Sequence, residues 1–210
     1  MDEQNDVIRM KVLVVGGPAS GKTSMIHQFC DGAFEEIYQP TIGVEFSSKF
    51  VTYEGRQVEI RLWDVAGQDY YAAMTRVYFS GAISALVVCD ITSKDSIEAV
   101  VKWKANIDDR VLFNEQKIPV ILVGNKSDLL NEKELTNVEN QLKEIKENEQ
   151  FTGVELISAK TSKNIDTCME KITKAVMTQF GDFLVQKQTP KVQSNQLEFK
   201  KVDKTNGCCQ

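Results

Sequence analysis

The chain has 210 residues, of which 42% are hydrophobic and 26% are charged, and its net charge is -5. That length suffices for one domain that buries roughly 70% of the surface its unfolded chain exposes. No stretch approaches the roughly 20 consecutive apolar residues that span a bilayer, and the acidic balance argues against a nucleic-acid binder. The N-terminus MDEQNDVIRM is acidic where a secretory signal would be basic and then apolar, so we expect a cytosolic protein.

Cysteine usage fits a reducing compartment. Cys30, Cys89 and Cys168 are far apart and lie in periodic segments, so we interpret them as reduced packing residues. Only Cys208 and Cys209 are adjacent, at the end of the chain, and no spacing typical of metal ligands is present.

Strand-like and helix-like segments alternate, which is typical of an α/β domain with a mostly parallel sheet. The predicted strands are Lys11–Val15, Glu45–Tyr53, Gln57–Asp64, Ala85–Cys89, Val120–Val123 and Val154–Ile157. The turn Glu54-Gly55-Arg56 joins the second and third strands into a predicted hairpin. The predicted helices are Lys22–Phe29, Ser96–Phe113, Glu132–Asn148 and Asn164–Phe180.

These elements divide the chain into three parts. We expect a flexible N-terminus at 1–7, one folded domain at 8–180 and a disordered tail at 181–210, which is rich in Gln, Lys, Asn and Thr. The tail has five Lys against two Asp and one Glu, a net charge of +2 that leaves -7 on the rest.

The first motif is a phosphate loop between a predicted strand and a predicted helix. Gly16 to Thr23 reads GGPASGKT, which satisfies G-x-x-x-x-G-K-[ST]. Its backbone N–H groups and the helix dipole would bind phosphate, Lys22 would reach the β- and γ-phosphates, and Thr23 would ligate Mg²⁺. A glycine-rich turn with a chance Lys-Thr is the alternative, expected in about one chain in a hundred. The predicted contacts are Gly17, Pro18, Ala19, Ser20, Gly21, Lys22, Thr23 and Ser24.

A second motif selects the base. Asn125-Lys126-Ser127-Asp128 follows an apolar strand, where ligands bind in open α/β sheets. The carboxylate of Asp128 can accept from the ring N–H and the exocyclic amine of guanine, a donor pair that adenine lacks. Ser158-Ala159-Lys160 follows the last strand. An ordinary loop is the alternative interpretation of each segment alone, but together the two segments favour guanine. Leu129 is a further predicted contact of the nucleotide.

With these motifs in order, the chain resembles the Ras superfamily over about residues 8–180. Tyr-x-Pro-Thr-Ile-Gly-Val-Glu-Phe from Tyr38 and Trp-Asp-Val-Ala-Gly-Gln from Trp63 look like Rab proteins. The resemblance implies a P-loop GTPase domain, α/β, with a six-stranded mostly parallel sheet, an antiparallel second strand and five helices. Phe151-Thr152-Gly153 resembles a tripeptide of the Rab branch linked to lysosome-related organelles.

The resemblance also implies roles for single residues. Phe34 would stack beside the base, Tyr38 would contact the nucleotide, and the Gly67 N–H would meet the γ-phosphate. The implied ligands of Mg²⁺ are Thr23, Thr41 and Asp64. The implied catalytic residues are Gln68, which would orient the attacking water, together with Lys22 and Thr41.

Two departures from the family pattern lie near the expected reaction. Pro18 stands where a small non-proline residue is usual, and Asp69-Tyr70-Tyr71 replaces Glu-Arg-Phe. Proline removes an N–H and fixes φ, but by resemblance the donor to the bridging oxygen is Ala19, which keeps its N–H. We therefore expect nucleotide binding to survive, and we leave the direction of any change in hydrolysis rate open.

Aromatic residues suggest a surface for partners. Period-2 phasing puts Trp63 on the more polar face of its strand, and by resemblance it joins Phe46 and Tyr78 in an effector surface. Half-buried packing is the alternative for all three, and for Phe46 the two interpretations are balanced. His27 is interpreted as a solvated or packed helix residue, and Trp103 as core.

These features predict a regulatory switch that binds GTP or GDP with Mg²⁺. With no Arg placed in cis by a motif, hydrolysis should be slow, on the order of 10⁻⁴ per second, without a GTPase-activating protein. An exchange factor, effectors and an escort resembling a GDP-dissociation inhibitor are the other implied partners, and we expect a monomer. A P-loop kinase and a GTP binder that has lost hydrolysis are the alternatives.

The C-terminus Gly207-Cys208-Cys209-Gln210 looks like the double-cysteine end on which Rab proteins receive two geranylgeranyl groups. An unmodified pair is the alternative. We expect a peripheral protein on the cytoplasmic face of intracellular membranes in vesicle trafficking, with a cytosolic pool. The organelle and the individual partners do not follow from the sequence.

Overall fold

The computed structural model describes residues 7–37, 39–67 and 75–188. Tyr38, Gln68, Asp69 and the cysteines Cys208 and Cys209 lie outside these residues. In chain order the helices are α1 (Lys22–Asp31), α2 (Thr75–Phe79), α3 (Lys94–Arg110), α4 (Glu132–Asn148) and α5 (Ile165–Gln188). The main strands are β1 (Ile8–Val15), β2 (Val44–Tyr53), β3 (Arg56–Val65), β4 (Ser84–Asp90), β7 (Val120–Asn125) and β8 (Gly153–Leu156).

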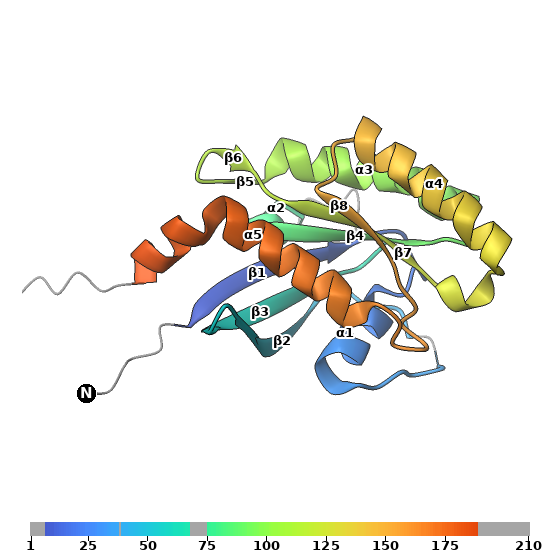
Figure 1. The fold of residues 1–210 in the computed structure, drawn as a ribbon, viewed down its shortest axis with the longest axis horizontal. Helices are drawn as coiled ribbons and strands as arrows, with labels where there is room; N and C mark the ends of the chain where they lie inside the picture. The colour runs from blue at the N-terminus through green and yellow to red at the C-terminus, as the bar shows by residue number, and fades with distance from the viewer. Residues whose placement is uncertain (1–6, 38, 68–74, 189–210) are drawn as a thin grey trace, which may run out of the picture.

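These six strands form one sheet in the order β2-β3-β1-β4-β7-β8 (Figure 1). Only the pair β2 and β3 is antiparallel, because a two-residue turn connects them, and the other pairs are parallel. Glu54 and Gly55 in that turn both have positive φ, 47° and 78°, which matches the twist of a tight hairpin. The expected sheet, its antiparallel second strand and the five helices are confirmed within the described residues.

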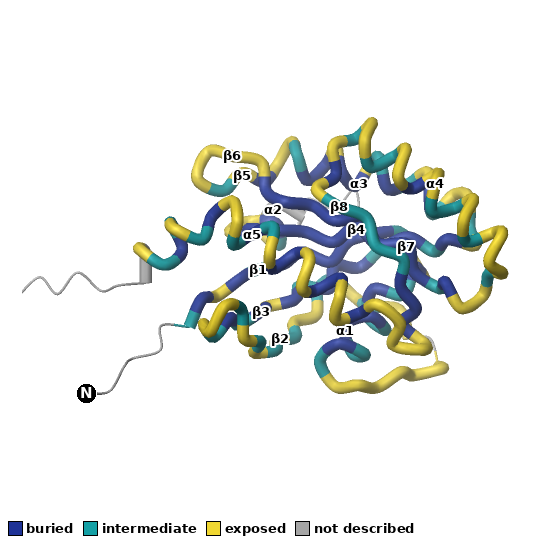
Figure 2. The backbone as a smooth tube through the Cα atoms, in the orientation of Figure 1, coloured by how far each residue is buried: buried dark blue, intermediate teal, exposed yellow. Residues whose placement is uncertain are grey.

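Helices cover the sheet, so its central strands are buried. Helix α5 contacts β1, β4, β7 and α1, while α3 contacts β4, and α4 contacts β7 and β8. Figure 2 shows the inner strands in dark blue, and all six residues of β7 are buried, as expected for parallel strands covered on both faces. None of the ten residues of β2 is buried. That edge strand therefore offers side chains to the surface.

The third helix is shorter than predicted. It was expected to reach Phe113, but it ends at Arg110, and β5 (Leu112–Phe113) pairs with β6 (Gln116–Lys117) instead. Two positive φ values in the turn between them favour this small hairpin. The hairpin also places Phe113 edge-on against Phe180, with ring centroids 4.9 Å apart. This contact with α5 explains why the helix ends before Phe113, although the sequence pattern predicted a helix up to that residue.

The last helix is longer than predicted. It continues from the expected end at Phe180 to Gln188, so the first residues of the predicted tail are helical. Phe180 and Leu184 lie one turn apart and are both buried, which explains the extension. Cys89 and Cys168 are buried free thiols and Cys30 is a half-buried one, which confirms their predicted packing role. No helix of the described chain is long and apolar enough to cross a membrane.

Candidate functional site

The phosphate loop runs from the end of β1 to the start of α1, as its motif requires. Gly16 has φ 147°, and a Cβ there would lie 2.0 Å from the Val88 carbonyl oxygen, so the loop needs glycine at this position. Lys22 is buried, and its ammonium donates to the carbonyl oxygens of Gly16 and Gly17 at 3.3 and 3.0 Å. Burial lowers the pKa of Lys22, and Asp64 partly offsets that effect. A bound anion would favour its charged form.

Three oxygen-bearing side chains meet beside the loop. Thr23 Oγ1 donates to Asp64 Oδ2 at 2.5 Å and lies 3.0 Å from Thr41 Oγ1, which itself donates to Asp64 Oδ2 at 3.2 Å. Asp64 Oδ1 is buried with no hydrogen-bond partner among the described residues. Burial raises the pKa of Asp64, while the bonds from Thr23 and the charge of Lys22 oppose the rise. The cluster has the hard oxygen donors that Mg²⁺ prefers, and the orphaned oxygen adds a free acceptor.

The base motif is fixed to both neighbouring loops. Asn125 Nδ2 donates to the Ser20 carbonyl at 2.9 Å, and Asn125 Oδ1 accepts from the Ala159 N–H at 3.0 Å. Asn125 therefore joins the phosphate loop to the loop after β8, across more than a hundred residues of sequence. Ser158 Oγ donates to Asp128 Oδ1 at 2.6 Å. This bond orients one carboxylate oxygen of Asp128.

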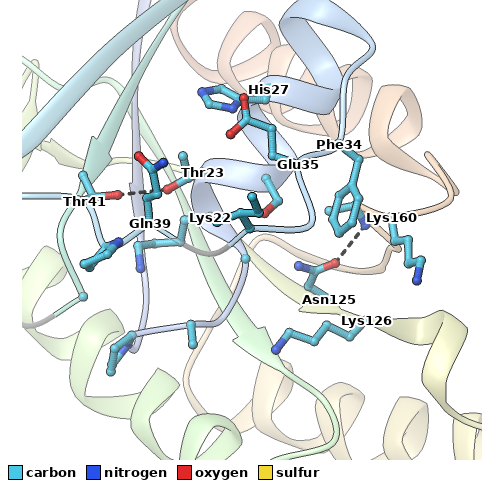
Figure 3. A pocket seen from close by; sticks show the side chains of 18 of the residues that line it. Lys22, Thr23, His27, Phe34, Glu35, Gln39, Thr41, Asn125, Lys126 and Lys160 are labelled. Atoms are coloured by element: carbon cyan, nitrogen blue, oxygen red, sulfur yellow. Dashed lines mark hydrogen bonds between the residues drawn. The ribbon is translucent and has the colours of Figure 1, made fainter.

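These loops surround a cavity of about 730 Å³ (Figure 3). In Figure 3 Thr23 and Thr41 lie at one end, and Asn125, Lys126 and Lys160 at the other. The predicted contacts that line it are Pro18, Ala19, Gly21, Lys22, Thr23, Ser24, Phe34, Thr41, Gly67, Asn125, Lys126, Asp128, Leu129, Ala159 and Lys160. Gly17, Ser20, Asp64 and Ser158 stand directly behind the lining and bond or contact it.

Some lining residues were missed by sequence reasoning. His27, Glu35 and Gln39 also line the cavity, and Figure 3 shows His27 and Glu35 close together at its rim. His27 follows Thr23 by four residues on α1, so the two share a helix face, and that spacing could have identified it. The interpretation of His27 as a solvated or packed helix residue is therefore incomplete, because His27 also forms part of the cavity wall.

Gly67 lies directly against the phosphate loop. A Cβ on Gly67 would come within 2.5 Å of the Pro18 nitrogen and 2.6 Å of the Gly17 carbonyl carbon. Contacts this short cannot be tolerated, so glycine is required for the approach of the segment after β3 to the loop. Pro18 itself is exposed at the cavity mouth.

Two of the three predicted surface aromatics are in contact. Phe46 and Trp63 meet edge to face with centroids 4.4 Å apart, and Phe46 is 61% exposed. That exposure favours the surface interpretation of Phe46 over packing. Tyr78 is half-buried and packs against the core, and its hydroxyl lies 3.6 Å from the Cβ position of Gly43. Trp103 is buried as predicted.

This sheet, with a glycine-rich phosphate loop after its first strand, defines a P-loop nucleotide-binding domain. The family model described as "Ras family" matches residues 11–178. Similar proteins include "Ras-related protein Rab-32B" of Dictyostelium discoideum, 36% identical over 95% of this chain and 76% of that protein. "Ras-related protein Rab-32" of Sus scrofa is 35% identical over 95% of this chain and 88% of its own length.

The chain therefore belongs to the Ras family, as one of its Rab proteins. It has the Ras-like G domain, binds GTP and GDP, and is a Rab-like GTP hydrolase of vesicle trafficking that works with regulators and effectors. This membership favours the switch over the kinase alternative.

Proposed function

We propose that the described cavity is the nucleotide site of this switch and that its residues have the roles expected from the sequence. The observation that carries the proposal is the meeting of Thr23, Thr41 and Asp64 at one end of a cavity whose other end contains Asp128. The separation of a phosphate end from a base end fits one nucleoside triphosphate.

At the phosphate end, the loop N–H groups and Lys22 would bind the β- and γ-phosphates. Lys22 would exchange its bonds to the Gly16 and Gly17 carbonyls for bonds to phosphate oxygens. Thr23, Thr41 and Asp64 would hold Mg²⁺, which neutralises charge on the β- and γ-phosphate oxygens when bound. Since Thr41 belongs to the segment before β2, its position would report the presence of the γ-phosphate.

At the base end, Asp128 would accept two hydrogen bonds from guanine while Ser158 keeps its carboxylate oriented. Phe34 and the stem of Lys126 would cover the base from the cavity wall. Gln68 would orient the attacking water and Tyr38 would close over the phosphates. These roles of Gln68 and Tyr38 are proposed from the family resemblance.

The roles of these residues are tested by exchanging the base. Asp128→Asn should lower GTP affinity and raise affinity for xanthosine triphosphate, because the amide presents N–H₂ where guanine also donates. Titration of nucleotide-free protein with fluorescent GTP, xanthosine triphosphate and ATP measures this, with Asp109→Asn on α3 as the matched control. Unchanged GTP affinity in Asp128→Asn would remove the base-reading role.

Hydrolysis is tested separately. Single-turnover rates of the native protein and Gln68→Leu should differ, with the native rate on the order of 10⁻⁴ per second. Equal rates would mean that Gln68 contributes nothing, and this outcome would support a GTP binder in which Pro18 and Asp69 have removed useful hydrolysis. The hydrolysis rate of Pro18→Gly then shows whether the proline in the phosphate loop causes the loss of hydrolysis.

The proposal extends to the membrane. Cys208 and Cys209 would carry geranylgeranyl groups that hold the protein on the cytoplasmic face of intracellular membranes, and a GDP-dissociation-inhibitor-like escort would extract the GDP form. The tripeptide Phe151-Thr152-Gly153 supports placement in the branch linked to lysosome-related organelles. Colocalisation of the tagged full chain with markers of those organelles tests that placement.

A further inference from the structure

Residues 33–37, which follow α1, form one wall of the nucleotide cavity. All five are exposed, and four of them, Phe34 to Ile37, line the cavity. None of the five belongs to a helix or a strand, so neither a backbone ladder nor buried packing fixes this wall. Its position therefore depends on contacts that single side chains make.

His27 faces this wall from the helix. It lies one turn after Thr23 on α1 and lines the same cavity. Figure 3 shows the Glu35 carboxylate turned toward the imidazole of His27, while the ring of the adjacent Phe34 is turned toward Lys160 at the base end of the cavity. A contact that holds Glu35 against α1 would therefore also hold Phe34 beside the base.

The charges around His27 leave it as the donor for this wall. Residues 31–37 include three acids, Asp31, Glu35 and Glu36, and no Lys or Arg. Within the described chain, neither His27 nor Glu35 forms an ion pair or a side-chain hydrogen bond with another residue. An imidazole donates an N–H to a carboxylate whether it is neutral or protonated, so the two groups match in chemistry.

We propose that His27 is a positioning residue for nucleotide retention. With nucleotide bound, it donates a hydrogen bond to Glu35, which holds residues 33–37 against α1 and Phe34 beside the base. Breaking this contact is then a step in the release of GDP. The inference rests on the proposed nucleotide site and adds the residues that set how long nucleotide stays there.

The rate of GDP release tests the contact directly. Stopped-flow release of a fluorescent GDP from the full-length chain compares the native protein with His27→Ala, Glu35→Gln and the double variant. Each single change should speed release about threefold, as expected for an exposed pair. The double variant should be no faster than the faster single variant, because the second change has no contact left to remove. Additive effects in the double variant would overturn the proposal.

A charge exchange separates positioning from structural damage. His27→Glu opposes two acids and should speed release further, whereas adding Glu35→Lys to it should return the rate to within twofold of the native value. Damage to the fold would not be repaired by a second substitution of this kind. A double variant as fast as His27→Glu alone would contradict the contact.

Asp31→Asn is the matched control. Asp31 lies four residues after His27 on α1, where helix side chains are neighbours, but it does not line the cavity. Its release rate should stay within about 1.5-fold of the native rate, since an exposed helix pair contributes little. Coupling of His27 to Asp31 in place of Glu35, measured with the same double-variant comparison, would show that the helix pair is the real contact.

Failure of this inference and failure of the nucleotide site give different results. A native chain that binds no fluorescent GDP would remove the proposed site and the role of His27 together. Native binding with identical release from every variant would leave the site in place and remove the role of His27 alone. Thermal unfolding of each variant with GDP present establishes that it is folded.

Discussion

The ammonium of Lys126 lies 2.6 Å from Asp90 Oδ2, which connects the end of β4 to the base motif after β7. Asp90 Oδ1 accepts from the N–H and the hydroxyl of Thr92 at 2.9 and 2.7 Å, so both carboxylate oxygens are used. Burial alone would raise the pKa of Asp90, but the bonds from Lys126 and Thr92 hold it below 3.8. The pair is therefore formed at neutral pH and is lost only as the pH falls through that lower value.

Asp90 is expected to position Lys126 along the cavity wall. The side chain of Lys126 is partly exposed, so its ion pair with Asp90, rather than packing, fixes its direction. Asp90→Asn should speed GDP release about fivefold, since a half-exposed pair contributes about 1 kcal/mol. Stopped-flow release of a fluorescent GDP measures the rate. Asp109→Asn on α3 serves as the control, and an unchanged rate in Asp90→Asn would show that the pair does not act on the nucleotide.

Gly67→Ala should damage the site through its backbone contact. Its Cβ would lie 2.5 Å from the Pro18 nitrogen, and since both partners are backbone, the phosphate loop or the segment after β3 must move. We expect at least a tenfold loss of affinity for a GTP analogue, or about 1.4 kcal/mol. Gly153→Ala is the matched control, because its Cβ would meet only ordinary contacts at 3.6 Å. Isothermal titration with both variants decides, and equal affinities would contradict the close approach.

The Lys11 ammonium lies 3.1 Å from the centroid of the Trp63 ring, and burial lowers the pKa of Lys11 to about 8. This lowered pKa makes a prediction about its reactivity. With a pKa of about 8, roughly half of its amine is neutral at pH 8, against less than about 1% for an ordinary lysine. Trp63→Ala removes the covering ring, so the pKa should rise and acetylation at pH 8 should slow, even though access increases. Peptide mass spectrometry after a timed pulse of acetylating reagent measures this. Phe46→Ala, which leaves the ring over Lys11 in place, should change nothing, and faster labelling in Trp63→Ala would contradict the burial argument.

Much of the fold was predictable because local signals and tertiary packing agree. The strands were found to within a few residues, and α4 was predicted with its observed bounds, since Asn131 and Glu134 form a capping box that fixes its start. The errors occur where distant contacts decide. Phe113 lies outside the helix that was predicted for it, because its ring contacts Phe180. Helix α5 extends beyond its predicted end because Leu184 is buried there. Neither contact is visible in local periodicity.

The site was predictable where a motif fixes a backbone shape. The motif of the phosphate loop and the motif that contains Asn125 and Asp128 each specify a backbone conformation. The structure places both motifs around one cavity. Glu35 was not found, because its place in the wall depends on how the segment after α1 folds back, whereas His27 was missed although its four-residue spacing from Thr23 on α1 was available. A second cavity, of about 350 Å³ and lined in part by Arg9, Arg61 and Leu184, was also not predicted, since these residues come from three elements whose proximity follows only from the sheet order and the path of α5.

The final prediction concerns the terminal cysteines, which lie outside the described residues. A tail charge of +2 is a weak membrane signal, worth about 1 kcal/mol per nearby Lys at best. One lipid chain gives marginal, reversible attachment at about 0.8 kcal/mol per buried CH₂, so stable anchoring would need both cysteines. Cys208→Ser and Cys209→Ser should each reduce the membrane-bound fraction in cells, and the double variant should abolish it.

Cys30→Ser, which changes a half-buried thiol within the folded domain, controls for loss of a cysteine as such. The mass of the C-terminal peptide gives an independent measurement, because two geranylgeranyl groups add a defined mass that each single variant should halve. A double variant that remains on membranes as well as the native chain, or a native peptide without isoprenoid, would show that the tail is not lipidated and that attachment comes from elsewhere. The native chain and the three tail variants should bind GDP equally, since none of the three changes a residue of the described nucleotide cavity.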